Sequence, residues 1–154
     1  MRTRLSITSL SARKRAGRSL KALDLHVSAG VVSFGDDAEK LIAPRKPGLA
    51  FSLGAMGSRS HNFYKDAYRR AGYPDVAADV QRLWLDGRRD EAAARVPDEL
   101  VLKTNLLGTD AMVRDRLALY RRAGITTIRV EPAGDTLDAR LGNLARLLEL
   151  AATE

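Results

Sequence analysis

Two stretches of the chain alternate like strands, and most other apolar residues recur at helical spacing. Residues 125–130 are β-branched except for Arg129, which predicts a short strand. Residues 25–34 place apolar side chains on both faces of an extended chain, as in a parallel strand covered on both sides. One face would carry Leu25, Val27, Ala29 and Val31, and the other Val32 and Phe34.

A helix is predicted directly before the strand at 125–130. Thr109 supplies a side-chain oxygen suited to an N-cap, and Gly124 stands where a left-handed residue would end the helix. Val113, Leu117 and Tyr120 fall on one apolar stripe between these ends. A helix that leads into a strand within about two residues is typical of α/β folds with parallel sheets.

The long segment between the two strands, residues 37–105, is predicted to contain helices only. Asp36 or Asp37 is suited to cap the first helix, which Pro44 and Pro47 stop or interrupt. Further helices are predicted from about Asn62, from Pro74 and from Pro97.

The chain ends in a predicted helix over residues 136–151, with Asp135 as its cap. Leucines at helical spacing form its apolar stripe, namely Leu137, Leu141, Leu144 and Leu148. We therefore expect this stripe to face the core.

Composition is that of a globular protein, with 45% apolar and 29% charged residues among 154. The chain contains no cysteine, which excludes disulfides and thiolate chemistry. Its two histidines do not form a zinc-binding pattern, so no metal site is predicted. No stretch approaches the ~18 apolar residues of a membrane span, and we expect a cytoplasmic protein.

The net charge of +7 comes from one end of the chain. Residues 1–23 hold seven of the 26 basic residues and no acidic one, so the remaining 19 balance the 19 acidic residues. Such an arm can bind phosphates or direct transport, but a helix and linker that precede a strand is the favoured interpretation. The arm has no aromatic residues for base stacking, which argues against a nucleic-acid partner.

Glycines before the helix at Asn62 form the first candidate site. Gly54 and Gly57, followed by Ser58 and Arg59, can form a turn whose backbone N–H groups bind a phosphate at a helix N-terminus. Close packing of the helix explains the glycines equally well.

The second candidate lies at the end of the strand at 125–130. Arg129 and Glu131 come just before or within the loop at residues 131–135, and parallel folds bind ligands at this end of their strands. A mutual ion pair is the alternative role for these two residues. No residue is assigned as catalytic.

The order of motifs resembles that of luciferase-like flavin and deazaflavin oxidoreductases. Residues 53–73 (LGAMGSRSHNFYKDAYRRAGY) resemble the Gly-x-x-Gly, Asn-Phe-Tyr and Arg-Arg-x-Gly-Tyr pattern of the deazaflavin-dependent branch. VPDEL at 96–100, LLGT at 106–109, and the helix, Gly124, strand and Leu-rich helix that follow match in the same order. The resemblance extends from about Leu25 to the C-terminus.

The resemblance implies a (β/α)8 barrel, which needs roughly 250 residues. With 154 residues, the chain is expected to be the C-terminal part of such a barrel: its last two βα units with a helical insertion at 24–154, after the basic arm at 1–23. The open strand edges would then favour oligomerisation or docking onto a missing N-terminal half.

The resemblance also implies chemistry. It implies hydride transfer between coenzyme F420, a deazaflavin, and a small organic substrate at the C-terminal mouth of the barrel. Gly54, Gly57, Ser58, Arg59 and Asn62 are the predicted coenzyme contacts. An FMN-dependent monooxygenase of the same family is the nearest alternative, and a non-enzymatic α/β module with a nucleic-acid-binding arm is the alternative from another class.

Overall fold

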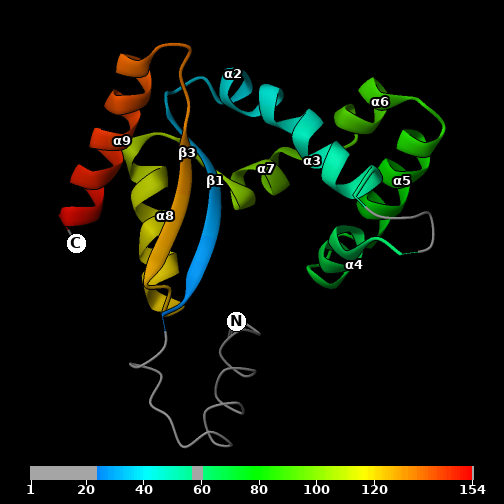
Figure 1. Cartoon of the computed structure of the whole chain (residues 1–154), viewed down its shortest axis with the longest axis horizontal. Helices are drawn as coiled ribbons and strands as arrows, with labels where there is room; N and C mark the ends of the chain where they lie inside the picture. The colour runs from blue at the N-terminus through cyan, green and yellow to red at the C-terminus, as the bar shows by residue number, and fades with distance from the viewer. Residues whose placement is uncertain (1–23, 57–60, 154) are drawn as a thin grey trace, which may run out of the picture. The chain divides into compact units, whose positions relative to one another are not determined.

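The computed structural model describes residues 24–56 and 61–153 and divides them into two units (Figure 1). Unit 1 combines residues 24–34 with 106–153, and unit 2 is the continuous segment 35–105. The basic arm at 1–23 lies outside the described residues. Within the described ranges, no helix is long and apolar enough to cross a membrane.

Unit 1 is an α/β unit with a parallel sheet. Its elements are strand β1 (His26–Phe34), strand β2 (Leu106–Gly108), helix α8 (Asp110–Arg122), strand β3 (Thr127–Pro132) and helix α9 (Leu137–Ala152). In the described part of the chain, the three strands form one sheet in the order β2-β1-β3, and β1 pairs in parallel with both neighbours. The α/β class predicted from the sequence is confirmed.

Strand β2 was not expected from the sequence, which predicted only two strands. It pairs Val32 with Leu106 and Phe34 with Gly108, and all three of its residues are buried. The order places β1 at the centre of the sheet, whereas consecutive strands of a (β/α)8 barrel pair in chain order. The barrel therefore stays a prediction.

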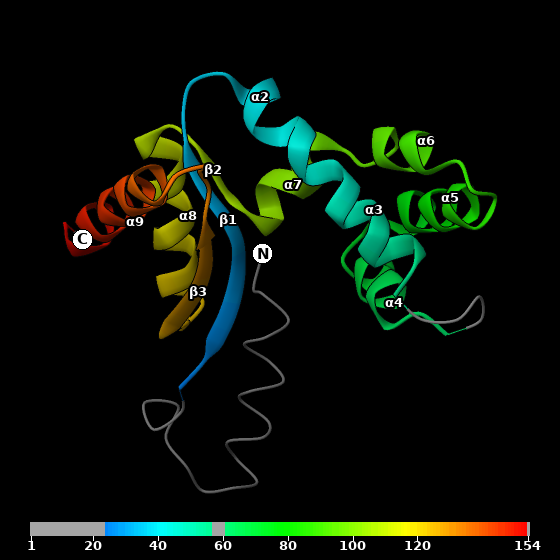
Figure 2. The ribbon, with the colours of Figure 1, turned by 45° about the horizontal axis from the view of Figure 1, so that its top comes forward.

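The core of unit 1 lies between the sheet and its two helices. Figure 2 shows α8 and α9 beside each other on one side of the sheet. The buried core residues come from the sheet and from both helices, namely Ala29, Val32, Leu106, Val113, Leu117, Leu147 and Leu150. Tyr120 packs against this cluster, so the predicted stripe of α8 is confirmed.

An irregularity in β1 changes the predicted assignment of its faces. Gly30 has a φ of 64°, and the pairing of β1 with β3 shifts register between Ser28 and Val31. The shift brings Val32 into the same core as Ala29, whereas the sequence placed these residues on opposite faces. A glycine accepts this left-handed conformation because it lacks a Cβ, and the extra residue reverses the alternation beyond it.

Helix α9 buries a different face from the predicted one. Leu147 and Leu150 enter the core, while the side chains of Leu137, Leu141 and Leu148 are exposed. Apolar residues cover so much of this helix that spacing alone did not identify the side facing the sheet. The cap also differs, because the hydroxyl of Thr136, not Asp135, accepts from the backbone N–H of Ala139.

The ends of α8 agree with the prediction. The hydroxyl of Thr109 accepts from the backbone N–H of Met112 at 3.4 Å, and Asp110 lies in the first turn, where a negative charge is favoured. Gly124 follows the helix with a φ of 81°. Local sequence therefore sets both ends of this helix.

Unit 2 is helical throughout its described residues, as predicted. Its elements are α2 (Ala38–Ile42), the 3-10 helix η2 (Ala43–Arg45), α3 (Lys46–Gly54), α4 (Phe63–Arg70), α5 (Pro74–Leu85), α6 (Arg89–Ala94) and α7 (Asp98–Thr104). Asp37 caps α2, and Pro44 and Pro47 begin η2 and α3, so the prolines divide one helical stretch into three. Helices α4, α5 and α6 all contact α3.

Candidate functional site

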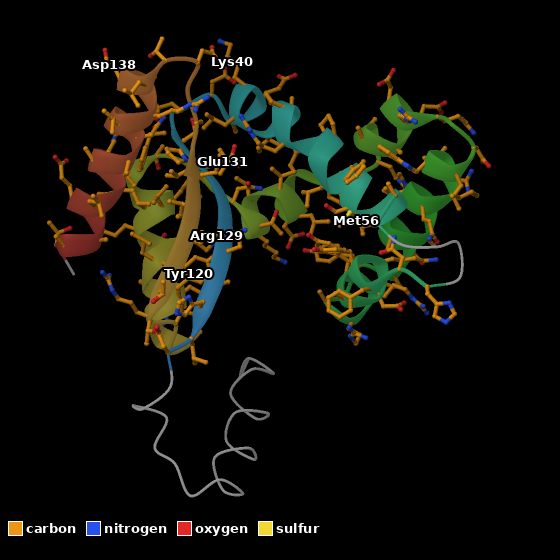
Figure 3. All side chains as sticks on the ribbon, in the orientation of Figure 1. Lys40, Met56, Tyr120, Arg129, Glu131 and Asp138 are labelled. Carbon is orange, nitrogen blue, oxygen red and sulfur yellow. The ribbon has the colours of Figure 1, made fainter. Side chains whose placement is uncertain are left out.

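A polar face of the sheet in unit 1 carries the candidate pair on β3. Ile128 and Val130 pack against the core, and side chains alternate along a strand, so Arg129 and Glu131 point away from the two helices. Both side chains are exposed, and Figure 3 labels them along β3. In β1, Ser28 lies beside Arg129 and Val31 lies beside Glu131.

Arg129 and Glu131 do not form the ion pair that was the alternative interpretation. Among residues 24–56 and 61–153, neither side chain has a hydrogen-bond or ion-pair partner. A guanidinium and a carboxylate therefore lie two residues apart on one sheet face, and both are accessible to a ligand. The predicted strand at 125–130 lies two residues too early, because β3 spans Thr127–Pro132 and Glu131 is a strand residue and not a loop residue. Arg129 lies near the end of the strand as predicted, and the role of both residues as a site stays a prediction.

The loop after β3 is held by side chains of α9. Asn143 Nδ2 donates to the carbonyl of Ala133 at 2.9 Å, and Arg140 Nε donates to the carbonyl of Gly134 at 2.8 Å. Gly134 has a φ of 140°, and a Cβ there would lie 2.7 Å from Cβ of Ala139. These contacts fix the loop at the end of the sheet where parallel folds bind ligands.

Arg146 connects three elements at the same end of the sheet. Its guanidinium lies 4.7 Å from the ring centroid of Phe34, the last residue of β1. Its Nε lies 2.7 Å from Oδ1 of Asp110, the first residue of α8. Sequence reasoning missed Arg146, because one arginine on an amphipathic helix gives no local sign of its partners.

The opposite end of the sheet is joined by Asp24. Its carboxylate accepts hydrogen bonds from the hydroxyls of Thr126 and Thr127, and its Oδ2 lies 2.7 Å from Nε2 of His26. The Thr126 hydroxyl, followed by His26, holds the pKa of Asp24 below its usual value. His26 thus has a hydrogen-bonded structural role at this end of the sheet.

The glycine segment of unit 2 is described only at its two ends. Gly54 is the last residue of α3 and is buried, and a Cβ there would lie 2.3 Å from Cγ of Trp84. This contact supports the packing interpretation of Gly54. Gly57, Ser58 and Arg59 lie outside the described residues, so their predicted contacts with a coenzyme stay predictions.

Asn62 has a structural role at the start of α4. Its Oδ1 accepts from the backbone N–H of Lys65 at 2.9 Å, and its Nδ2 donates to the carbonyl of Leu53 at 2.8 Å. Only 3% of the residue is exposed. The side chain thus caps α4 and ties it to the end of α3, and its predicted coenzyme contact is not tested by these bonds.

The sheet face of unit 1 is suited to bind and orient a polar ligand. A guanidinium can donate two parallel hydrogen bonds to a phosphate or carboxylate, and a carboxylate accepts from hydroxyls. The fixed loop at residues 133–136 gives these groups a rigid setting.

The sequence model of a family described as luciferase-like monooxygenases matches residues 3–127. A putative coenzyme F420-dependent oxidoreductase of Mycobacterium tuberculosis is 40% identical over 119 residues, which are 77% of this chain and 34% of the relative. The chain thus spans about a third of that relative's length.

One solved structure shares the fold. The coenzyme F420 dependent tetrahydromethanopterin reductase from Methanopyrus kandleri has a TM-score of 0.59 and 24% sequence identity to this chain. The match covers 92% of this chain and 37% of that one.

Proposed function

Because this chain belongs to the family of luciferase-like monooxygenases, we propose that it contributes to an oxidoreductase that transfers hydride between coenzyme F420 and a small organic substrate. The assignment of F420 as the coenzyme is supported by the 40% identity with the putative F420-dependent oxidoreductase of Mycobacterium tuberculosis. The aligned region covers 77% of this chain.

Unit 1 is proposed to be part of a (β/α)8 barrel, as the motif order suggests. Its strands are parallel, its two helices cover one face, and the opposite face carries Val31 as well as Ser28, Arg129 and Glu131. Parallel sheets are usually covered on both faces, and the binding sites of such barrels lie at the C-terminal ends of the strands, where Arg129 and Glu131 are located. In a barrel, β2 would lie between β1 and β3. Strand β3 would then pair with β2 in place of β1.

The residues of this face fit an anionic, hydroxyl-bearing coenzyme. Arg129 has no ion-pair partner among the described residues and can bind a phosphate or carboxylate. Glu131 can accept hydrogen bonds from hydroxyl groups. Arg140 and Asn143 keep the adjacent loop in place, which preserves the geometry of a bound ligand. The coenzyme itself supplies the hydride chemistry.

FMN is the second candidate coenzyme. The matched family is described as monooxygenases, and a flavin would use the same kind of polar sheet face. Direct comparison of the two coenzymes separates these functions, because both are fluorescent and both can be titrated under the same conditions.

The test is equilibrium binding of coenzyme F420 to the purified chain, followed by fluorescence anisotropy, with FMN in parallel. We expect saturable binding of F420 that Arg129→Ala weakens about 10- to 100-fold, the loss of one charged hydrogen-bonded contact. Arg114→Ala removes an exposed arginine from α8, which lies on the other face of the sheet, and is expected to bind F420 normally.

Three outcomes would contradict these expectations. A folded chain that binds neither coenzyme would refute the proposed function for this chain. Tighter binding of FMN than of F420 would make FMN the coenzyme of this chain. Equal effects of Arg129→Ala and Arg114→Ala would remove Arg129 from the site.

A further inference from the structure

The irregularity of β1 determines which of its last side chains reach the polar face of the sheet. Val32 lies in the core of unit 1 together with Ala29, three residues earlier, and Phe34 packs against the same core. Side chains alternate along a strand, so Ser33, between Val32 and Phe34, points to the opposite face. Its neighbour on β2 is Leu107.

Gly30 causes this placement. Its φ of 64° is open to glycine without strain, and it interrupts the alternation between Ala29 and Val32. A regular strand would keep Ser33 on the side of Ala29, inside the core, and would turn Val32 outward. The polar face therefore receives a hydroxyl near the C-terminal end of β1, where regular alternation would place an apolar side chain.

The placement of Ser33 does not depend on which strand is the neighbour of β3. It follows from Gly30, from the core and from the pairing of β1 with β2, and these two strands are consecutive along the chain. Consecutive strands are also neighbours in a (β/α)8 barrel. The hydroxyl of Ser33 thus faces away from α8 and α9 in both arrangements.

Ser33 offers a hydroxyl close to the end of the sheet where parallel folds bind ligands. It is the last residue but one of β1, and its side chain is partly exposed. In the described part of the chain the hydroxyl has no hydrogen-bond partner, whereas Leu107 beside it is only 4% exposed. An apolar neighbour keeps water away from one side of the hydroxyl, so a hydrogen bond to a ligand is stronger there than in open solvent.

We propose that Ser33, turned outward at Gly30, is a ligand-contacting residue of the polar face, an inference that rests on the proposed function. Its hydroxyl donates a hydrogen bond to an oxygen atom of bound coenzyme F420. A hydroxyl can donate and accept, so it complements Arg129, which only donates, and Glu131, which only accepts when ionised.

The placement of Ser33 is tested by cysteine labelling without coenzyme. The chain contains no cysteine, so an introduced thiol is the only one that iodoacetamide can alkylate. We expect Ser33→Cys to react at least about 10-fold faster than Val32→Cys, because a buried thiol reacts only when the structure opens. Ala29→Cys is a second buried control, which keeps the test decisive if Val32→Cys fails to fold. Mass spectrometry measures the rates.

The contact is tested by fluorescence anisotropy with F420. Ser33→Ala should weaken binding roughly 3- to 10-fold, the loss of one hydrogen bond from a neutral group. Ser33→Thr keeps the hydroxyl and should bind within about 2-fold of the parent chain. Thr153→Ala is the matched control, because the Thr153 hydroxyl bonds to carbonyls of its own helix, α9, and its removal should leave F420 binding unchanged.

Each outcome decides one part of the proposal. Faster alkylation of Val32→Cys than of Ser33→Cys would overturn the placement, and so would a Ser33→Cys thiol that reacts as slowly as that of Ala29→Cys. Unchanged F420 binding by Ser33→Ala, or equal weakening by Ser33→Ala and Ser33→Thr, would overturn the contact while the proposed function stands. A parent chain that does not bind F420 would refute the proposed function and the contact together, whereas the alkylation rates would still decide the placement.

Discussion

Substitution of Gly54 by alanine tests the structural role of a residue that the sequence suggested for coenzyme binding. An added Cβ would lie 2.3 Å from Cγ and 2.4 Å from Cβ of Trp84. These atoms are close to the Trp84 backbone, so the side chain cannot relieve the contact by rotating a distant end. Helix α3 or α5 must shift instead.

The magnitude follows from two opposed terms. Overpacking of this kind costs about 1–3 kcal/mol. Replacement of glycine by alanine within a helix contributes up to about 1 kcal/mol in the other direction. We therefore expect Gly54→Ala to destabilise unit 2 by about 1–2 kcal/mol. Gly48→Ala is the matched control, because Gly48 lies in the same helix and a Cβ there meets nothing within 4 Å.

The assay is urea unfolding followed by tryptophan emission. Trp84 is the only tryptophan of the chain and lies in unit 2, so its emission reports on this unit. Gly54→Ala should lower the unfolding midpoint, and Gly48→Ala should leave it unchanged or raise it. A Gly54→Ala variant as stable as the parent would refute the packing role, and weaker F420 binding by that variant would restore Gly54 to the coenzyme site.

Three further changes have defined outcomes. Asn62→Ala removes the cap of α4 and the bond to Leu53, and it should lower the stability of unit 2 by about 1–2 kcal/mol in the same urea assay; no change would show that both bonds are replaced by water. Thr109→Ala should cost about 1 kcal/mol in unit 1, measured by circular dichroism, unless another group caps α8. Hydrogen bonding from Arg95 lowers the pKa of Asp79 from 3.8. The ionised Asp79 therefore stabilises unit 2 above that pH, and this stabilisation is lost as the pH falls below it. Asp79→Asn should therefore make the stability of unit 2 fall less steeply with pH in the acid range. An unchanged pH profile of stability would contradict this role of Asp79.

Local signals predicted the helices because each acts within a few residues. Thr109 and Gly124 marked both ends of α8, and Pro44 and Pro47 marked the breaks that divide the first helices of unit 2. Strand β2 escaped prediction because three residues are too short to show a period. Its burial depends on pairing with β1, which is remote in sequence.

Features that depend on packing between elements could not be read from the chain. The sequence placed the core of α9 on the side of Leu137, whereas the sheet lies on the side of Leu147. The register shift at Gly30 and the contacts of Arg146 also depend on distant partners. By contrast, the side of the sheet on which Arg129 lies was predictable, because the alternation of side chains along a strand alone defines it.

Unit 2 is inserted between two strands that pair with each other, which has a consequence for how the chain can be re-engineered. Val32 of β1 lies beside Leu106 of β2, so the insertion at residues 35–105 leaves and re-enters unit 1 at adjacent points. A segment with neighbouring ends can be exchanged for another of different length at little cost in loop entropy, as long as about a dozen residues remain to cross between parallel strands. The helical insertion is thus a replaceable module, through which recombination between related chains could alter one unit while the sheet of the other is retained.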